Sequence, residues 1–103
     1  MKTLASIVAT LSLLGSAAVH AGDVEAGANK AAVCMGCHGP EGISVNPLWP
    51  NLAGQHAQYL EKQINAFRDG ARVEPTMQPF VATLSDADVA DIVAFFAARK
   101  ACR

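Results

Sequence analysis

The pentapeptide Cys34-Met35-Gly36-Cys37-His38 constrains this chain more than any other feature. Two thiols separated by two residues can form thioethers with the two vinyl groups on one edge of a porphyrin. A histidine directly after the second thiol then lies under the ring, where an imidazole nitrogen can bind the iron. The motif therefore predicts that Cys34 and Cys37 attach one c-type haem and that His38 is its proximal iron ligand.

Two other interpretations of the cysteine pair compete with haem attachment. A redox disulfide of the thioredoxin type needs a βαβ context, and no β-rich run flanks this pair. A zinc site needs four ligands, and only His56 and Cys102 remain as candidates, without a second cluster of metal ligands. Haem attachment is favoured over both alternatives.

Residues 1–21 have the pattern of a secretory signal peptide. Lys2 is followed by an apolar run over residues 4–14, and the segment closes on Val19-His20-Ala21. The run is too short to span a bilayer comfortably, and no later segment is long and apolar enough to anchor the chain. We expect cleavage after Ala21 and a periplasmic protein that does not span the membrane.

Residues 22–103 are then expected to form one small domain of 82 residues. A chain this short buries only a thin core, and a covalently held haem would add a large apolar plate to it. Without Lys2, seven basic residues stand against nine acidic ones, a formal charge of −2. This balance argues against nucleic acid as a partner.

Helical periodicity and capping signals predict an all-α class without paired strands. Helices are expected over residues 24–33, 55–69 and from Ser85 to near Arg99, separated by loops over residues 39–54 and 71–84 that are rich in glycine and proline.

Individual residues support these boundaries. Asp23 and Ser85 are expected N-caps, and Gly70 is the expected stop of the second helix. Gly27 lies inside the first helix, where it costs stability relative to alanine. An interior glycine of this kind often marks the close approach of another element.

Met77 is the predicted sixth ligand of the iron. Met35 lies between the two anchoring cysteines, where it cannot reach the opposite haem face. Met77 lies in a loop bounded by two prolines, residues 75–79, far enough along the chain to cross to the distal side. A gap-filling core methionine is the alternative role of Met77. His56 is the less favoured sixth ligand.

Two further sets of residues have open roles. Arg68 and Arg72 flank the end of the second helix, and a guanidinium there can pair with a haem propionate. A solvated arginine at a helix C-terminus is the alternative. Cys102 is the odd cysteine, so we expect a monomer, with a dimer linked through Cys102 as the alternative.

The ordered motifs resemble those of the class I c-type cytochromes. They are the attachment motif at residues 34–38, then Pro50-Asn51-Leu52, Met77-Gln78-Pro79 and the C-terminal segment at residues 91–96. The chain is most similar to short bacterial mono-haem cytochromes related to single halves of the two-domain, di-haem cytochromes. The resemblance covers essentially all of residues 23–101.

This resemblance implies three main helices wrapped around one haem, with His38 and Met77 as iron ligands. It further implies that the Pro50 carbonyl accepts the other ring N–H of His38. It also implies that Gly27 packs under Phe95, with Phe96 nearer the haem. Further residues that it suggests for the haem wall are Leu52, Ile64 and Phe80.

The function that the resemblance implies is that of a periplasmic one-electron carrier, not an enzyme. Its partners would be redox proteins such as a membrane cytochrome complex, a terminal oxidase or a reductase. The first alternative is an electron-acceptor subunit of a periplasmic dehydrogenase or oxidase. The second is a gas sensor or peroxidase, in which Met77 leaves the iron.

Overall fold

The computed structural model describes residues 3–10 and 22–102. Residues 3–10 form no helix or strand, and the side chains of Leu4 and Ile7 are more than nine-tenths exposed. The rest of the expected signal peptide, including the cleavage position after Ala21, lies outside the described residues. Within the described ranges, no helix has the length and apolar character needed to cross a membrane.

The described residues contain five helices and no strands, which confirms the all-α class. The helices are α1 (Val24–Lys30), α2 (Ala32–His38), α3 (Ala57–Asp69), α4 (Gln78–Val81) and α5 (Asp86–Ala97).

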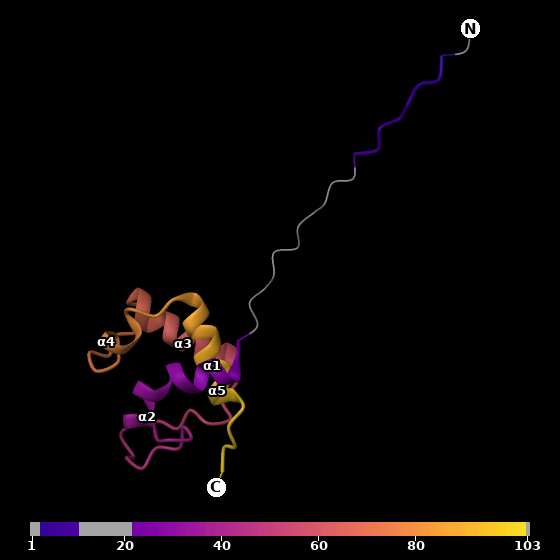
Figure 1. Cartoon of the computed structure of the whole chain (residues 1–103). Coiled ribbons are helices and arrows are strands. Elements are labelled where there is room, and N and C mark those ends of the chain that lie inside the picture. The colour runs from indigo at the N-terminus through magenta and orange to yellow at the C-terminus, as the bar shows by residue number, and fades with distance from the viewer. Residues whose placement is uncertain (1–2, 11–21, 103) are drawn as a thin grey trace.

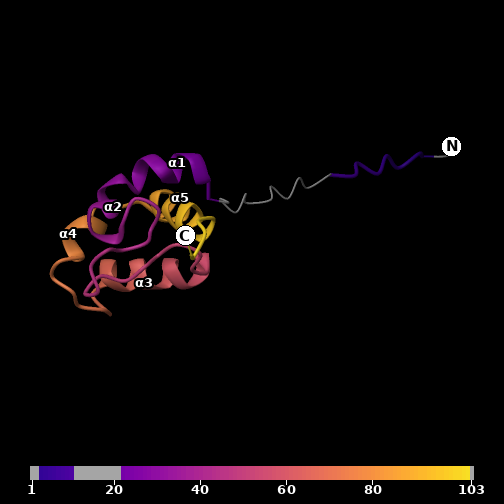
Figure 2. The same ribbon diagram turned by 90° about the horizontal axis from the view of Figure 1, so that it is seen from below.

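Helix α5 is the centre of the packing. It contacts both α1 and α3 and lies between them in Figure 2. In Figure 1, α2 and α4 both lie to the left of α1 and α5. The largest fully buried side chains, Val89, Ile92 and Phe96, all belong to α5. Burial of this apolar stripe drives α1, α3 and α5 together.

The first predicted helix is wrong in its extent. Instead of one helix over residues 24–33 that ends before Cys34, α1 ends at Lys30 and α2 continues to His38. The chain turns at Ala31, whose ψ angle of −5° departs from the helical value. Ala31 is fully buried in the core. Tertiary packing therefore sets the break, and the attachment motif itself is helical.

The other helix ends follow the local signals more closely. Helix α3 begins two residues later than expected, at Ala57, and ends before Gly70, which has the left-handed φ of 83°. Ser85 caps α5 through a capping box with Asp88, as its sequence favours. Helix α5 ends at Ala97, slightly before the expected Arg99. Helix α4 was not predicted and forms one turn inside the expected loop over residues 71–84.

A charged cluster joins α1 to α5. The carboxylate of Asp91, only 4% exposed, accepts a hydrogen bond from the Asp23 backbone N–H at 2.8 Å and pairs with the Lys30 ammonium. Lys30 Nζ also lies 3.0 Å from Asp88 Oδ1. The hydrogen bonds to Asp91 and Asp88 raise the pKa of Lys30. The Ser85 backbone N–H and then Lys30 lower the pKa of Asp88.

Candidate functional site

A cavity of about 470 Å³ lies where α2, α3, α4 and α5 approach one another. Its volume is in the range of pockets that hold small molecules and cofactors. The structure brings to its wall the residues predicted to attach the haem, bind its iron or surround it: Cys34, Cys37, His38, Pro50, Leu52, Ile64, Met77, Phe80 and Phe96. These residues come from α2, α3, α4, α5 and both long loops, so only the folded chain assembles them.

His38 is held on one side of the cavity with its ring orientation fixed. Its side chain is buried, and Nδ1 lies 2.7 Å from the carbonyl oxygen of Pro50. A carbonyl can only accept, so Nδ1 donates the proton of this bond. Nε2 is then the ring nitrogen left for a metal ion, which is the usual arrangement of a ligating histidine. The contact that the resemblance implied between His38 and Pro50 is present.

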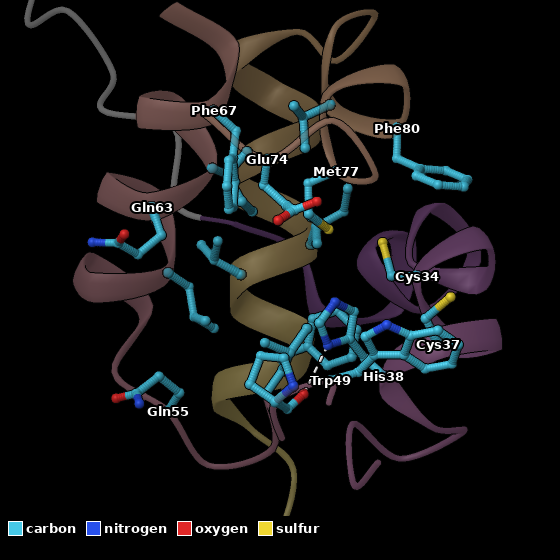
Figure 3. Close-up of a pocket in the computed structure, with 18 of the residues that line it drawn as sticks. Cys34, Cys37, His38, Trp49, Gln55, Gln63, Phe67, Glu74, Met77 and Phe80 are labelled. Atoms are coloured by element: carbon cyan, nitrogen blue, oxygen red, sulfur yellow. Dashed lines mark hydrogen bonds between the residues drawn. The ribbon is translucent and has the colours of Figure 1, made fainter. Parts of the chain in front are cut away.

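Helix α2 presents the two thiols to the same cavity. Cys34 and His38 are four residues apart on one helix, so they share a face. Cys34 and Cys37 are not joined in a disulfide, and both are half-buried. Figure 3 shows their sulfur atoms on the same side of the cavity. The thiols are therefore placed to reach one edge of a shared ligand.

The same surroundings weigh against the two competing interpretations of this motif. Burial raises the pKa of the Cys34 thiol, whereas redox-active C-x-x-C pairs depend on a lowered thiol pKa. In the part of the chain that the structure describes, no three side chains among His, Cys, Asp and Glu are grouped to hold a metal ion. The zinc interpretation therefore finds no ligand set there.

Met77 approaches the cavity from the other side. In Figure 3 its thioether points into the space that separates it from His38. The side chain is half-buried, and its loop is held by Glu74: the Glu74 carbonyl accepts from Met77 N at 3.0 Å. The Glu74 carboxylate accepts from Thr76 N at 3.1 Å. This turn keeps the sulfur atom at the cavity.

His56 is not among the residues that line the cavity. It is exposed and is the N-cap residue of α3. The sequence left it open as a sixth ligand, and its position gives that alternative no support. Gln55, one residue earlier, does line the cavity.

The two candidate arginines differ in position. Arg68 lies outside the cavity wall, 3.0 Å from Asp86 Oδ1 in an ion pair. Arg72 lies on the wall, donates to Gln63 Oε1 at 2.9 Å and stacks on the ring of Phe67 at 4.6 Å. Of the two, only Arg72 is placed to meet a carboxylate in the cavity.

Several aromatic residues of the wall were not among the predicted haem-wall residues. Trp49, Tyr59 and Phe67 line the cavity together with the predicted residues. Helical spacing predicts Phe67 on the same apolar face of its helix as Ile64, and the structure confirms that it is buried. Trp49 precedes Pro50 in an irregular loop, and no periodic pattern indicates which way such a side chain points.

The residues of the cavity fit a covalently attached haem. The wall is mostly apolar, one imidazole is oriented by its Nδ1 hydrogen bond, and a soft thioether faces it across the cavity. Two thiols lie at one edge, as the thioether linkages of a c-type haem require. Phe96 closes the wall from α5 and is 1% exposed.

Comparisons with known proteins agree with this site. The family model described as cytochrome c matches residues 24–99. Cytochrome c4 of Pseudomonas aeruginosa is 48% identical over 99 residues, which cover 96% of this chain and 49% of that protein. The thiosulfate dehydrogenase electron acceptor of Stutzerimonas stutzeri is 42% identical over 79 residues, or 75% of this chain and 37% of that protein.

A solved structure has the same fold. The reduced recombinant cytochrome c4 from Pseudomonas stutzeri superposes with a TM-score of 0.74 at 42% identity, over 78% of this chain and 47% of that one. The chain thus spans about half the length of the cytochrome c4 proteins that it matches.

Proposed function

Since the chain belongs to the cytochrome c family, we propose that it carries single electrons between redox proteins of the periplasm. Its fold is the class I cytochrome c fold, as the sequence indicated, and its cofactor is covalently bound haem c. The observation that carries the proposal is the placement of both thiols, the oriented His38 and the Met77 thioether around one apolar cavity.

Each residue of this set has a separate task. The haem supplies a one-electron couple at its iron. Cys34 and Cys37 would hold it covalently, and His38, through Nε2, and Met77 would bind its iron. With these two side chains as ligands, the iron would have no free position for a substrate. The arrangement therefore suits a carrier better than an enzyme.

The residues around the cavity influence the reduction potential of the haem. A thioether is a soft, weakly basic ligand, so Met77 favours the reduced state and raises the reduction potential. The buried apolar side chains of Ile92 and Phe96 disfavour the extra charge of the oxidised state. The hydrogen bond from His38 to Pro50 acts in the other direction, because it makes the imidazole a stronger donor.

The periplasmic location is part of the proposal. Residues 1–21 have the charge, apolar run and small residues of a signal peptide, with cleavage after Ala21. The mature domain would then be residues 22–103. Partners in that compartment would be redox proteins such as a membrane cytochrome complex, a terminal oxidase or a reductase.

A role as an electron-acceptor subunit is the second candidate. It is favoured by the 42% identity to a protein named a thiosulfate dehydrogenase electron acceptor. Both roles use the same haem site. Purification from periplasm separates them, because a subunit would copurify with a stoichiometric catalytic partner and a free carrier would not.

Absorption spectra of the periplasmic protein test the main proposal. Oxidised and reduced spectra should show a low-spin c-type haem, with the weak far-red sulfur-to-iron band in the oxidised form. A redox titration should follow a single one-electron curve, and the reduced protein should not bind carbon monoxide at neutral pH. Rapid carbon monoxide binding would instead support the sensor or peroxidase alternative.

A further inference from the structure

We propose that Asn51 is a positioning residue for the proximal side of the site. Through its side chain it holds the Pro50 carbonyl against the His38 ring, and so it lowers the reduction potential of the protein. This role rests on the proposed function, because it requires His38 to be an iron ligand. Nothing in the sequence pattern assigns a side-chain role to Asn51.

Hydrogen bonds close a loop between the attachment motif and α3. The Ser44 backbone N–H donates to Asn51 Oδ1 at 2.7 Å. Immediately beside this bond, the Gly42 carbonyl accepts from the backbone N–H groups of Leu52 and Ala53, at 2.7 and 3.0 Å. Residues 42–44 are therefore joined to residues 51–53 by three hydrogen bonds, and Pro50 is the next residue along.

Ser44 connects this closure back to α2. Its hydroxyl lies 2.9 Å from the carbonyl oxygen of Asn46 and 3.3 Å from that of Cys37, with one proton to share between them. It also accepts from Asn46 N at 3.1 Å. Cys37 directly precedes His38. The Asn51 side chain thus connects two backbone positions through Ser44. One is Cys37, which precedes His38, and the other is Pro50, whose carbonyl contacts the His38 ring.

On the N-terminal side of Pro50, Trp49 lines the cavity and its backbone N–H donates to the Asn46 carbonyl at 3.1 Å. Val45 and Leu48 are 87% and 85% exposed, so apolar burial at these two positions does not fix the segment that leads to Pro50. Asn51 itself is exposed at the edge of the cavity. Its hydrogen bond with Ser44 is therefore the polar restraint nearest to the Pro50 carbonyl on the C-terminal side.

A fixed Pro50 carbonyl has a chemical consequence. The shorter and straighter the bond from His38 Nδ1 to this oxygen, the more basic the imidazole and the stronger its donation to the metal ion. Stronger donation stabilises the oxidised state. Release of the carbonyl should therefore raise the reduction potential, while the covalent attachment and the Met77 ligand stay in place.

The test compares Asn51→Ala with Asn46→Ala in the full holoprotein. Asn46 makes the same kind of bond in the same loop, since its Oδ1 accepts from Leu48 N at 2.9 Å, but this bond closes a local turn before Pro50 and does not join residues 42–44 to residues 51–53. Asn51→Ala should raise the ratio of reduced to oxidised protein about threefold at a fixed potential. That is about 28 mV at 59 mV per tenfold for one electron. Asn46→Ala should leave the ratio at the wild-type value.

A second readout follows the His38 ring itself. By NMR, its Nδ1 proton should exchange with solvent faster in Asn51→Ala than in the wild type or Asn46→Ala. Asn51→Asp keeps an acceptor for Ser44 N and adds negative charge, so its potential should not rise. If Asn51→Ala gives no holoprotein, Asn51→Gln, which moves the acceptor by one methylene, must show the same rise.

Equal potentials for Asn51→Ala and the wild type would overturn the proposal, as would an equal rise in Asn46→Ala. A different result would reject the proposed function, namely a wild-type spectrum without the features of a c-type haem with a sulfur ligand. A wild type with that spectrum and an unchanged Asn51→Ala would reject only the role of Asn51.

Discussion

Gly27 of α1 and Asp91 of α5 are in backbone contact. A Cβ atom at position 27 would lie 1.9 Å from the Asp91 carbonyl oxygen and 2.9 Å from the Cβ of Phe95. No side chain fits there unless the two helices separate. The glycine that helix propensity disfavours is therefore required by the close contact between α1 and α5.

Gly27→Ala is expected to destabilise the holoprotein. Alanine should gain about 1 kcal/mol of helix propensity, but forced separation of packed backbones typically costs about 1–3 kcal/mol or more. Denaturant unfolding measures the net effect. Gly36→Ala in α2 is the matched control, because its added Cβ meets nothing within 4 Å. Gly36→Ala should be neutral or stabilising, and equal losses in the two variants would contradict this explanation.

The ion pairs between α1 and α5 predict how stability depends on pH. The pKa of Asp88 lies below its ordinary value of 3.8, because the Ser85 N–H and Lys30 stabilise the carboxylate. Its contribution to stability is thus present above about pH 4 and is lost as the pH falls through the lower, folded-state pKa. Lys30 shows the opposite sign: its raised pKa gives stability that is lost above 10.5.

Asp88→Asn should therefore make the unfolding free energy less dependent on pH below about pH 4. Asparagine keeps an oxygen that can accept the Ser85 N–H and loses only the charge. Denaturant titrations at a series of pH values measure this slope. Parallel curves for the variant and the wild type would show that the carboxylate contributes nothing through its charge.

Cys34→Ala and Cys37→Ala should each abolish or severely reduce holoprotein formation. Each thiol makes one of the two thioethers, and without haem the cavity of about 470 Å³ would leave much of a small core unfilled. Haem-stained gels of periplasmic extracts give the yield. Cys102→Ala is the control with a normal yield, since Cys102 does not line the cavity. Normal yields of doubly attached haem in either cavity variant would end the c-type interpretation.

Met77→Ala should keep the haem but lower the reduction potential and admit carbon monoxide or imidazole to the distal position. Loss of the thioether removes the ligand that favours the reduced state. His56→Ala should leave the visible spectrum unchanged, because His56 is exposed and outside the cavity wall. The ligand assignment is wrong if the spectrum shifts in His56→Ala and not in Met77→Ala.

Cys102 provides a test of the oligomeric state. It is exposed, a free thiol, and outside the cavity wall. We expect protein taken directly from cells to run as a monomer on non-reducing gels, with the thiol open to labelling. A dimer band that disappears on reduction and in Cys102→Ser would support the disulfide-linked alternative. In either case the haem spectrum should not change.

Short-range signals in the sequence determined much of this protein. Covalent spacing within residues 34–38 predicts the cofactor, because two thiols and an imidazole must meet one porphyrin edge and its iron. The caps at Asp23, Ser85 and Gly70 fix helix ends through hydrogen bonds and dihedral angles that involve only nearby residues. These features do not depend on how distant segments pack.

Only the tertiary structure decided the other helix boundaries and the contacts within the loops. The break at Ala31 follows from its burial against other elements, and the turn of α4 forms where the loop after α3 closes over the cavity. The contact between Ser44 and Asn51 depends on a chain reversal in an irregular loop. Periodicity reports which side chains are apolar, whereas the direction of a loop residue is set by contacts with segments distant in sequence. For that reason the sequence determined which groups bind the cofactor, and only the folded chain decided how they are held.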